Sequence, residues 1–393
     1  MRRIVATVLV GLSLFTSACT VIPTNQGDES AVQRRNIEGY LNSDASITPN
    51  GGLKFLLWRL SAFIQRLPAA PLAPTPQVPA DIGVLRANAA PGVTMQPSIT
   101  WIGHATVLAQ FGGLTWLTDP MFSPSCSPFK FYRCPRVQPP GIALADLPHV
   151  DVVLISHDHY DHLDRPSVQA LAAQPGGSPL FIVPLELRFW FYAAGITNVV
   201  DLAWWQTHSI GSIDVVLTPA QHTSGRNVSD IKQTLWGGFA VFAPDFHLFY
   251  SGDTGYSKDF SEMRRRFANR QRDGGFDIAL LPIGAYQPRW FMKNIHIDPT
   301  EAVQVHRDLN AKRSLGVHWG TFELSGESLD EPPRDLALAS AAAGLANDEF
   351  FVMAIGETRR LARRALPNVE ASDTRSSPTA AMDTKESATN GNL

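Results

Sequence analysis

The segment SHDHYDHLD at positions 156–164 contains three histidines and three aspartates. His157, His159, Asp161 and His162 within it form the pattern H-x-H-x-D-H. In an extended segment alternate side chains point to the same side, whereas a turn of the loop can direct Asp161 and His162 to a second point. Imidazole and carboxylate are typical zinc ligands. Because burying so many of these groups without a cation would be costly, the pattern predicts a metal site, and one loop can serve two ions.

Apolar strands elsewhere in the chain also stop at a histidine or an aspartate. Strands anchored in a core hold the residues at their ends rigidly, as a metal site requires. We therefore expect further ligands to join the loop at a sheet edge. The runs are Val153-Leu154-Ile155 before His157, Val215-Val216-Leu217 before His222, Leu248-Phe249-Tyr250 before Asp253, and Leu315-Gly316-Val317 before His318.

Regular structure is expected from about Ser98, as short apolar strands with tight turns, so that residues 98–362 form the folded domain. Residues 363–393 lack hydrophobic periodicity and are expected to be a disordered tail. Helices are predicted around 166–173, 185–194, 259–269, 299–309 and 332–344.

The N-terminus predicts export. Residues 1–18 combine two arginines, a short apolar run and small residues, which is typical of a signal peptide, and the box ending at Cys19 resembles that of bacterial lipoproteins. Cys19 would then carry the lipid, although ordinary cleavage nearby would leave a free thiol. A lipid-anchored protein of the cell envelope is expected, at the outer membrane facing the periplasm. Cys126 and Cys134 can form a disulfide in an oxidising compartment, or remain two thiols.

Residues 19–50 are polar and are expected to be a tether, and residues 51–97 to hold a helix and a Pro-rich connector. The stretch from Leu53 to Leu67 has its apolar residues on one helical face. This face either docks on the body of the protein or meets a membrane or acyl chains.

The overall composition limits the function classes. The chain has 393 residues, of which 44% are hydrophobic and 18% charged, with a formal net charge of −3. It is therefore expected to fold around a sizeable core. Since no basic patch with interleaved aromatic residues occurs, nucleic acid is not an expected partner.

Several longer motifs carry a resemblance to a known family. The sequence resembles the metallo-β-lactamase fold hydrolases, and among them the group of phospholipases D that hydrolyse N-acylphosphatidylethanolamine. The motifs occur in order between about residues 98 and 325. They are TWIGHATV, LTDPMFS, LISHDHYDHLD, PAQHTSGR, SGDTGY, LPIGAYQPRWFMK followed by HIDPTEA, and VHWGTFELS.

The resemblance implies an αββα sandwich with two zinc ions at strand ends. His104 would lie near the site in a packed structural role, and Asp119 would support the ligand loop. The implied ligands are His157, His159 and His222 for the first ion and Asp161, His162 and His318 for the second, with Asp253 bridging both.

The resemblance also implies hydrolysis of a phospholipid to phosphatidic acid and N-acylethanolamine. A hydroxide bridging the metals would attack phosphorus, and Asp253 would orient it. His296 would lie near the reacting phosphate, and Arg289 and Lys293 are candidate phosphate contacts. Gln287 stands where the family often has Glu.

Two other functions are compatible with the sequence. The same metal site can hydrolyse a lactone or another phosphodiester, whereas a β-lactamase is disfavoured because Asp253 replaces the usual zinc-binding cysteine. The chain can also be a lipoprotein that keeps metals only for stability. A bridging carboxylate argues against the latter, since structural zinc sites are normally closed and mononuclear.

Overall fold

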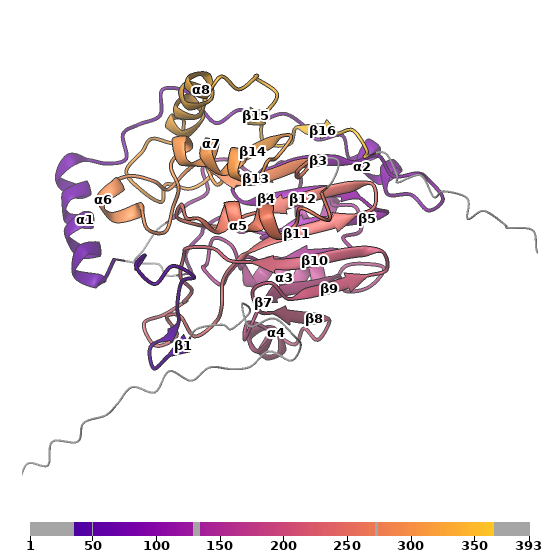
Figure 1. Cartoon of the computed structure of the whole chain (residues 1–393), viewed down its shortest axis with the longest axis horizontal. Helices are drawn as coiled ribbons and strands as arrows, with labels where there is room; N and C mark the ends of the chain where they lie inside the picture. Colours follow the sequence, from indigo (N-terminus) through magenta and orange to yellow (C-terminus); the bar gives the residue numbers. More distant parts are fainter. Residues whose placement is uncertain (1–34, 49, 129–133, 272–273, 365–393) are drawn as a thin grey trace, which may run out of the picture.

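Two seven-stranded mixed sheets stack face to face, with helices on their outer faces (Figure 1). The computed structural model describes residues 35–364 except 49, 129–133 and 272–273. This arrangement confirms the αββα sandwich expected from the sequence. The signal peptide, Cys19 and the tail from residue 365 lie outside the described residues.

The first sheet has two halves that share β5. Neighbouring strands pair antiparallel from β16 through β3 and β4 to β5, and parallel from β5 through β6 and β7 to β8. The inner parallel strands β6 and β7 are apolar and almost entirely buried, as strands covered on both faces must be. The order is β16 (Thr358–Arg360), β3 (Ser98–Gly103), β4 (Thr106–Phe111), β5 (Leu114–Thr118), β6 (Val152–Leu154), β7 (Leu180–Pro184) and β8 (Val199–Leu202).

The second sheet repeats this plan, with parallel pairs from β12 to β15 and antiparallel pairs from β9 to β12. Loops after β6 in the first sheet and after β10, β12 and β14 in the second carry the predicted ligands. The order is β15 (Phe350–Phe351), β14 (Ser314–Val317), β13 (Ile278–Pro282), β12 (Phe246–Tyr250), β11 (Gly238–Ala243), β10 (Ile213–Thr218) and β9 (Thr207–Ile210).

The main core lies between the sheets, where large side chains such as Trp101, Trp116, Phe239 and Phe246 are buried. A second apolar cluster joins the outer face of the first sheet to its helices. The first sheet carries α2 (Ile82–Asn88), the 3-10 helix η2 (Leu144–Asp146), α3 (Arg165–Ala172) and α4 (Arg188–Ala193), and the second α5 (Asp259–Arg266), α7 (Pro299–Asp308) and α8 (Glu331–Ala343).

Helix α2 was not expected, because its seven residues lie beside the Pro-rich connector. Asp81 begins it by accepting a hydrogen bond from the backbone N–H of Val84. At the other end of the domain, Arg364 belongs to the segment expected to be a tail but is buried, and its guanidinium pairs with Asp277 at 2.6 Å. The described fold therefore extends slightly beyond residue 362.

The segment before residue 51 contacts the domain from residue 35 onward. It forms β1 (Arg35–Asn36) and β2 (Gly39–Tyr40), and Tyr40 and Asn42 are buried. The polar composition that suggested a tether does not reveal these few anchoring contacts.

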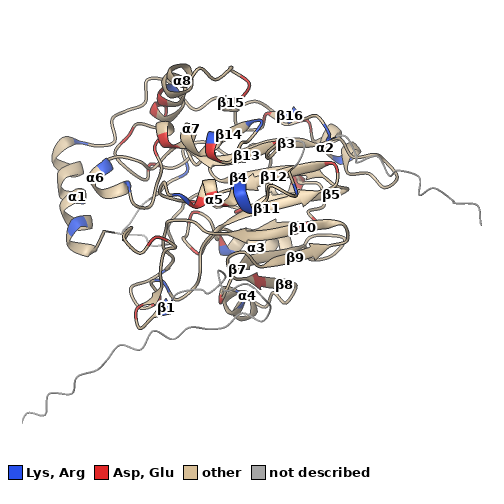
Figure 2. Ribbon diagram, in the orientation of Figure 1, with Lys and Arg blue, Asp and Glu red and all other residues tan. Residues whose placement is uncertain are grey.

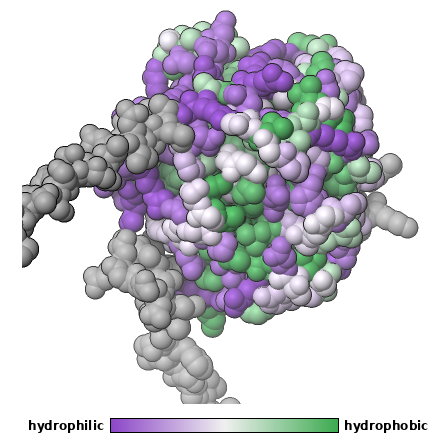
Figure 3. All heavy atoms as spheres, turned by 90° about the vertical axis from the view of Figure 1, so that its right-hand side faces the viewer, coloured by the Kyte–Doolittle hydropathy of each residue, from purple (hydrophilic) through white to green (hydrophobic). Residues whose placement is uncertain are grey.

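Helix α1 (Gly52–Gln65) then lies beside the short helix α6 (Arg289–Met292) at one end of the molecule (Figure 1). Figure 3 looks onto the opposite end, where hydrophobic side chains are grouped within a mostly hydrophilic surface. Among the described residues, no helix is both long and apolar enough to cross a membrane.

Cys126 and Cys134 are joined by a disulfide. It closes the loop after β5, and the two cysteines are buried with Met121 and Phe322. The structure thus favours the bonded alternative over two thiols.

Candidate metal centre

Loops from both sheets bring the predicted ligands to one place. The loop after β6 supplies the H-x-H-x-D-H residues, and the second sheet supplies the other three. Those three are His222 after β10, Asp253 after β12 and His318 after β14. Most of these side chains are fully buried. Strand ends therefore position the donors, as the sequence predicted.

Three histidines form the first group of donors. His159 Nδ1 lies 2.8 Å from His157 Nε2 and 3.2 Å from His222 Nε2. Donors bound tetrahedrally to one zinc ion at about 2.1 Å lie about 3.4 Å apart. The three nitrogen atoms are thus spaced as ligands of a single ion would be.

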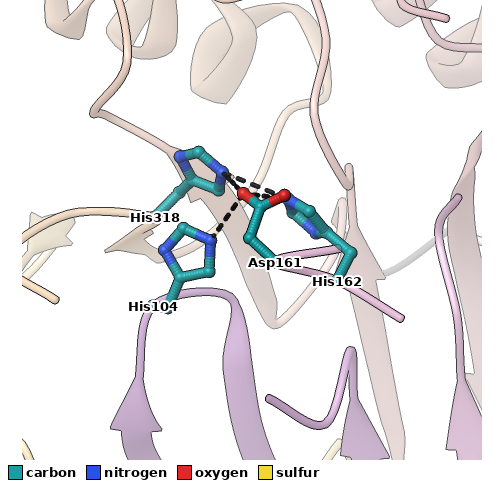
Figure 4. Close-up of side chains that lie close together, drawn as sticks. All are labelled: His104, Asp161, His162 and His318. Carbon is teal, nitrogen blue, oxygen red and sulfur yellow. Dashed lines mark hydrogen bonds and ion pairs between the residues drawn. The ribbon is translucent and has the colours of Figure 1, made fainter. Parts of the chain in front are cut away.

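Asp161, His162 and His318 form the second group (Figure 4). His162 Nε2 lies 3.3 Å from Asp161 Oδ2 and 3.1 Å from His318 Nε2. The Asp161 and His318 atoms are 3.6 Å apart. These distances also suit one ion.

Asp253 lies between the two groups. Its Oδ2 is 3.2 Å from both His162 Nε2 and His318 Nε2, and 3.9 Å from His222 Nε2. Its Oδ1 is buried without a hydrogen-bond partner among the described residues. A buried carboxylate oxygen without a partner is unfavourable unless a cation binds it, so the site fits a pair of metal ions bridged by Asp253.

Burial and neighbouring charges hold most of the donors in the forms that metals bind, whereas the Asp253 and Asp161 carboxylates raise the pKa of His162 and His318, so these two imidazoles must lose a proton when a metal binds. Burial lowers the pKa of His157 and His222 well below the usual value, which favours neutral imidazole. Burial opposes ionisation of Asp161 and Asp253, but the His162 imidazole beside both keeps their pKa well below the usual range. Neutral imidazole and ionised carboxylate are the coordinating species.

Asp119 fixes the orientation of His162. Its Oδ2 accepts a hydrogen bond from His162 Nδ1 at 2.6 Å, so that Nε2 faces the other donors. Asp119 also accepts hydrogen bonds from the backbone N–H and the hydroxyl of Ser156, at 2.7 and 2.5 Å, and from the hydroxyl of Tyr250. Burial, together with the Asp119 charge, raises the pKa of Tyr250 well above its usual value, so this hydroxyl stays a donor. The supporting role implied for Asp119 corresponds to this geometry.

The Asn42 side chain in the N-terminal segment and the carbonyl of Ile295, shortly after α6, position His222. Its Nδ1 donates to the carbonyl of Ile295 at 3.0 Å, and its backbone N–H donates to Asn42 Oδ1 at 3.0 Å. Neither Asn42 nor the Tyr250 hydroxyl was predicted as support for the donors. Tyr250 ends one of the ligand-bearing strands, so its position was a usable signal, whereas nothing in the sequence distinguishes Asn42.

Residues between the ligands anchor the loop. Asp158 accepts hydrogen bonds from the Gly225 N–H and the Thr234 hydroxyl, at 2.6 and 3.0 Å. The Arg226 guanidinium lies 3.9 Å above the Tyr160 ring and donates to the carbonyl of Asp158. The loop is thus held through residues that do not face the donor groups.

His104 lies against the second group of donors (Figure 4). Its Nε2 is 3.1 Å from Asp161 Oδ2, and its carbonyl accepts from the His318 N–H at 3.0 Å. His104, Asp119 and His318 all have positive φ, which is costly for residues other than glycine and often occurs at functional sites.

The three predicted substrate-binding residues differ in their distance from the donor groups and in their partners. His296 is buried, with Nδ1 3.9 Å from Asp253 Oδ2, so it borders the centre. Arg289 pairs with Glu301 at 2.7 Å and donates to the carbonyl of His296 at 2.8 Å, so in this structure it supports His296. Lys293 is exposed next to α6.

Comparisons with known proteins agree with this geometry. Residues 115–319 match the model of the β-lactamase superfamily domain. The chain is 37% identical over 270 residues to N-acyl-phosphatidylethanolamine-hydrolyzing phospholipase D 1 of Caenorhabditis elegans, covering 66% of this chain and 74% of that one. A mitochondrial phospholipase D of the same name from Saccharomyces cerevisiae is 36% identical, over 66% of this chain and 55% of its own.

Other relatives have no such name. An uncharacterised Mycobacterium tuberculosis protein is 37% identical over 293 residues, with 73% of each chain covered. Among solved structures, an isothiocyanate hydrolase from Delia radicum gut bacteria has a TM-score of 0.53 at 21% identity, covering 67% of this chain and 99% of its own. A possible metal-dependent hydrolase from Veillonella parvula has a TM-score of 0.54 at 19% identity, with 68% and 100% covered. These two structures support the fold.

The two donor groups predict the metal content. Protein purified without chelator should contain about two divalent ions per chain by elemental analysis. His222→Ala should lower this number, because only its group loses a nitrogen donor. A chain without bound metal under these conditions would contradict the proposed centre.

The Asp119 network predicts a graded loss of metal affinity. Asp119→Asn should weaken binding about 10- to 100-fold, because the carboxylate that accepts from His162 is lost. Tyr250→Phe should have a smaller effect, since the other hydrogen bonds to Asp119 remain. Competition with a chromogenic chelator measures both. If Asp119→Asn binds metal like the parent, Asp119 contributes only to packing.

Proposed function

Since the chain belongs to the metallo-β-lactamase superfamily of metal-dependent hydrolases, we propose that it is a zinc-dependent phospholipase of the D type. The substrate would be an N-acylphosphatidylethanolamine or a closely similar phospholipid. The products would be phosphatidic acid and an N-acylethanolamine.

The observation that carries this proposal is the similarity to two phospholipases D from distant organisms, at 37% and 36% identity. Residues 115–319, which match the superfamily model, include both the loop that bears the first ligands and the segment around α6. An equally similar mycobacterial protein without a known activity leaves the substrate to experiment.

The donor set supports zinc as the metal. Five imidazoles and two carboxylates would hold the ions, and imidazole with carboxylate suits zinc better than magnesium or calcium. The bound ions would lower the pKa of a water molecule and offset the negative charge that grows on the phosphate oxygens.

Asp253 and His296 are the side chains best placed to act on the phosphodiester. The free Oδ1 of Asp253 can accept a hydrogen bond from the attacking water and so fix its direction. Burial lowers the pKa of His296 to about 4, so its ring is neutral at neutral pH. Its Nδ1 has no hydrogen-bond partner among the described residues, which leaves the ring able to contact a phosphate oxygen.

Arg289 contributes indirectly. Its guanidinium joins Asp298, Glu301 and the carbonyl of His296. We therefore expect it to hold His296 against the centre. Lys293 remains available to meet a lipid headgroup.

The products of phospholipid cleavage test the substrate and the bond. Incubation with a panel that includes N-acylphosphatidylethanolamine, phosphatidylethanolamine and phosphatidylcholine should release phosphatidic acid, most rapidly from the N-acylated lipid. Mass spectrometry identifies the products. Diacylglycerol would indicate cleavage on the other side of phosphorus. Absence of any cleavage by metal-loaded protein would refute the proposal.

Asp253→Asn should reduce phosphodiesterase activity by about a hundredfold or more, because the charge that serves both donor groups is removed. The fold should persist, as measured by circular dichroism. Asp146→Asn is the matched control and should keep full activity, because Asp146 is an exposed aspartate of η2 and is not among the predicted ligands. A fully active Asp253→Asn variant would remove the bridging role.

A further inference from the structure

Helix α1 turns its leucine-rich face away from the protein. Leu53 is 73% exposed, Phe63 82% and Ile64 70%. With 100° per residue, these positions lie on the side of the helix opposite Trp58 and Ala62, its only buried residues. The same face also exposes Leu56, Leu57, Leu60 and, just after the helix, Leu67.

The opposite side of α1 fixes the helix to the body. The Trp58 ring stacks on Phe291 with centroids 5.2 Å apart, and Met292 completes this buried cluster. Asn50, before the helix, donates to the carbonyl of Phe291 at 2.5 Å. The helix is therefore held in place while its larger apolar face stays in solvent, which is unusual for a surface helix.

The charged residues of α1 and of the segment that contains it are all basic. The helix carries Lys54 and Arg59 with no acidic residue, and the chain has no Asp or Glu between Asp44 and Asp81. The half-exposed Trp290 lies on α6, which packs beside α1, and the exposed Lys293 directly follows α6. Figure 2 shows basic positions, in blue, along the ribbon of α1 and α6 at this end of the molecule.

We propose that this face of α1, together with Trp290 and Lys293, docks on an anionic phospholipid surface. A short amphipathic helix with leucine and phenylalanine on one side and basic residues at the flanks is suited to lie in the interface of a bilayer. Tryptophan is favoured at the same depth. This proposal deepens the phospholipase function by assigning the partner surface from which the substrate comes.

A second copy of the chain fits this face less well. A symmetric contact places the same patch of both subunits together. Lys54, Arg59 and Arg66 of both copies would then gather at one interface without an acidic residue of the helix to offset them, and juxtaposed like charges at an interface are unfavourable. An anionic bilayer instead attracts each of them, by about 1 kcal/mol per basic residue near its surface.

The docked side of α1 is adjacent to the metal centre. Ile295 packs against the cluster of Trp58, Phe291 and Met292, and its carbonyl accepts the hydrogen bond from His222 Nδ1. His296 follows directly in sequence and borders Asp253. A bilayer at α1 would therefore lie beside the segment that forms one wall of the centre.

Vesicle binding tests the proposal. The full chain with Cys19→Ser is used throughout, so that no acyl chain at this position contributes. Leu56→Ser with Phe63→Ser should lower partitioning into phosphatidylglycerol-containing vesicles by about tenfold or more. Leu338→Ser, at a similarly exposed leucine on α8, is the matched control and should bind like the parent.

The basic residues are tested separately. Lys54→Glu should weaken binding to anionic vesicles and much less to phosphatidylcholine vesicles, because only the charge attraction is reversed. Arg264→Glu on α5 is its control. Unchanged binding of both α1 variants, or a shift from dimer to monomer without loss of vesicle binding, would overturn the proposal.

Two activities separate this proposal from the phospholipase function. The Leu56→Ser/Phe63→Ser variant should lose about tenfold in kcat/KM on vesicle phospholipid but keep the parent rate on bis(p-nitrophenyl) phosphate, a soluble diester. Vesicle binding without phospholipid cleavage would refute the phospholipase function alone. Equal loss on the soluble diester would show that the α1 substitutions damage the centre, and would overturn the docking role.

Discussion

The metal donors come from both sheets, so the centre exists only while the two sheets keep a fixed position relative to each other. Packing between the sheets supplies this constraint. Trp101 on β3 stacks on Trp319, which follows the predicted ligand His318, with centroids 5.0 Å apart. The indole N–H of Trp101 and the backbone N–H of His318 both donate to the carbonyl of His104. A contact in the core thereby sets the position of a ligand. Because cores are packed at crystal-like density, small shifts there would be felt at the donors.

The donor set was predictable because each ligand has a local signal, either the H-x-H-x-D-H spacing or an apolar strand that stops at His or Asp. The partners that orient the ligands lack such signals. Asn42 contacts His222 from a segment 180 positions away, and its polar neighbours suggest a tether. For Arg289 a local signal is present but misleading. Its position in the motif suggests a phosphate contact, but the acidic residues that neutralise it, Asp298 and Glu301, come from the start of α7.

The helices and strands, too, were predictable where the sequence carries a strong local signal and not where it lacks one. Strands with long apolar runs, such as β6, β10 and β13, were predictable from pattern. The edge strand β9 was not expected, since its alternation of exposed and half-buried residues leaves little hydrophobic signal. Apolar periodicity predicted α1 almost to its ends but did not show whether its apolar face packs on the domain or faces outward. Periodicity identifies which residues share a side, whereas the available partner decides which side is buried.

For α1 that partner is small. Helix α6 has only four residues, and Phe291 and Met292 are the side chains that it offers to the buried cluster. Such a contact can cover one tryptophan and the alanine beside it but not a row of leucines. Trp58 therefore occupies the small surface that α6 offers, and the larger leucine-rich face stays exposed. Burying each exposed leucine would contribute about 1.5–3 kcal/mol. Because the domain does not bury these leucines, the same free energy can be gained when an external apolar surface covers them. Since α1 lies next to Ile295, that surface would lie beside the metal centre.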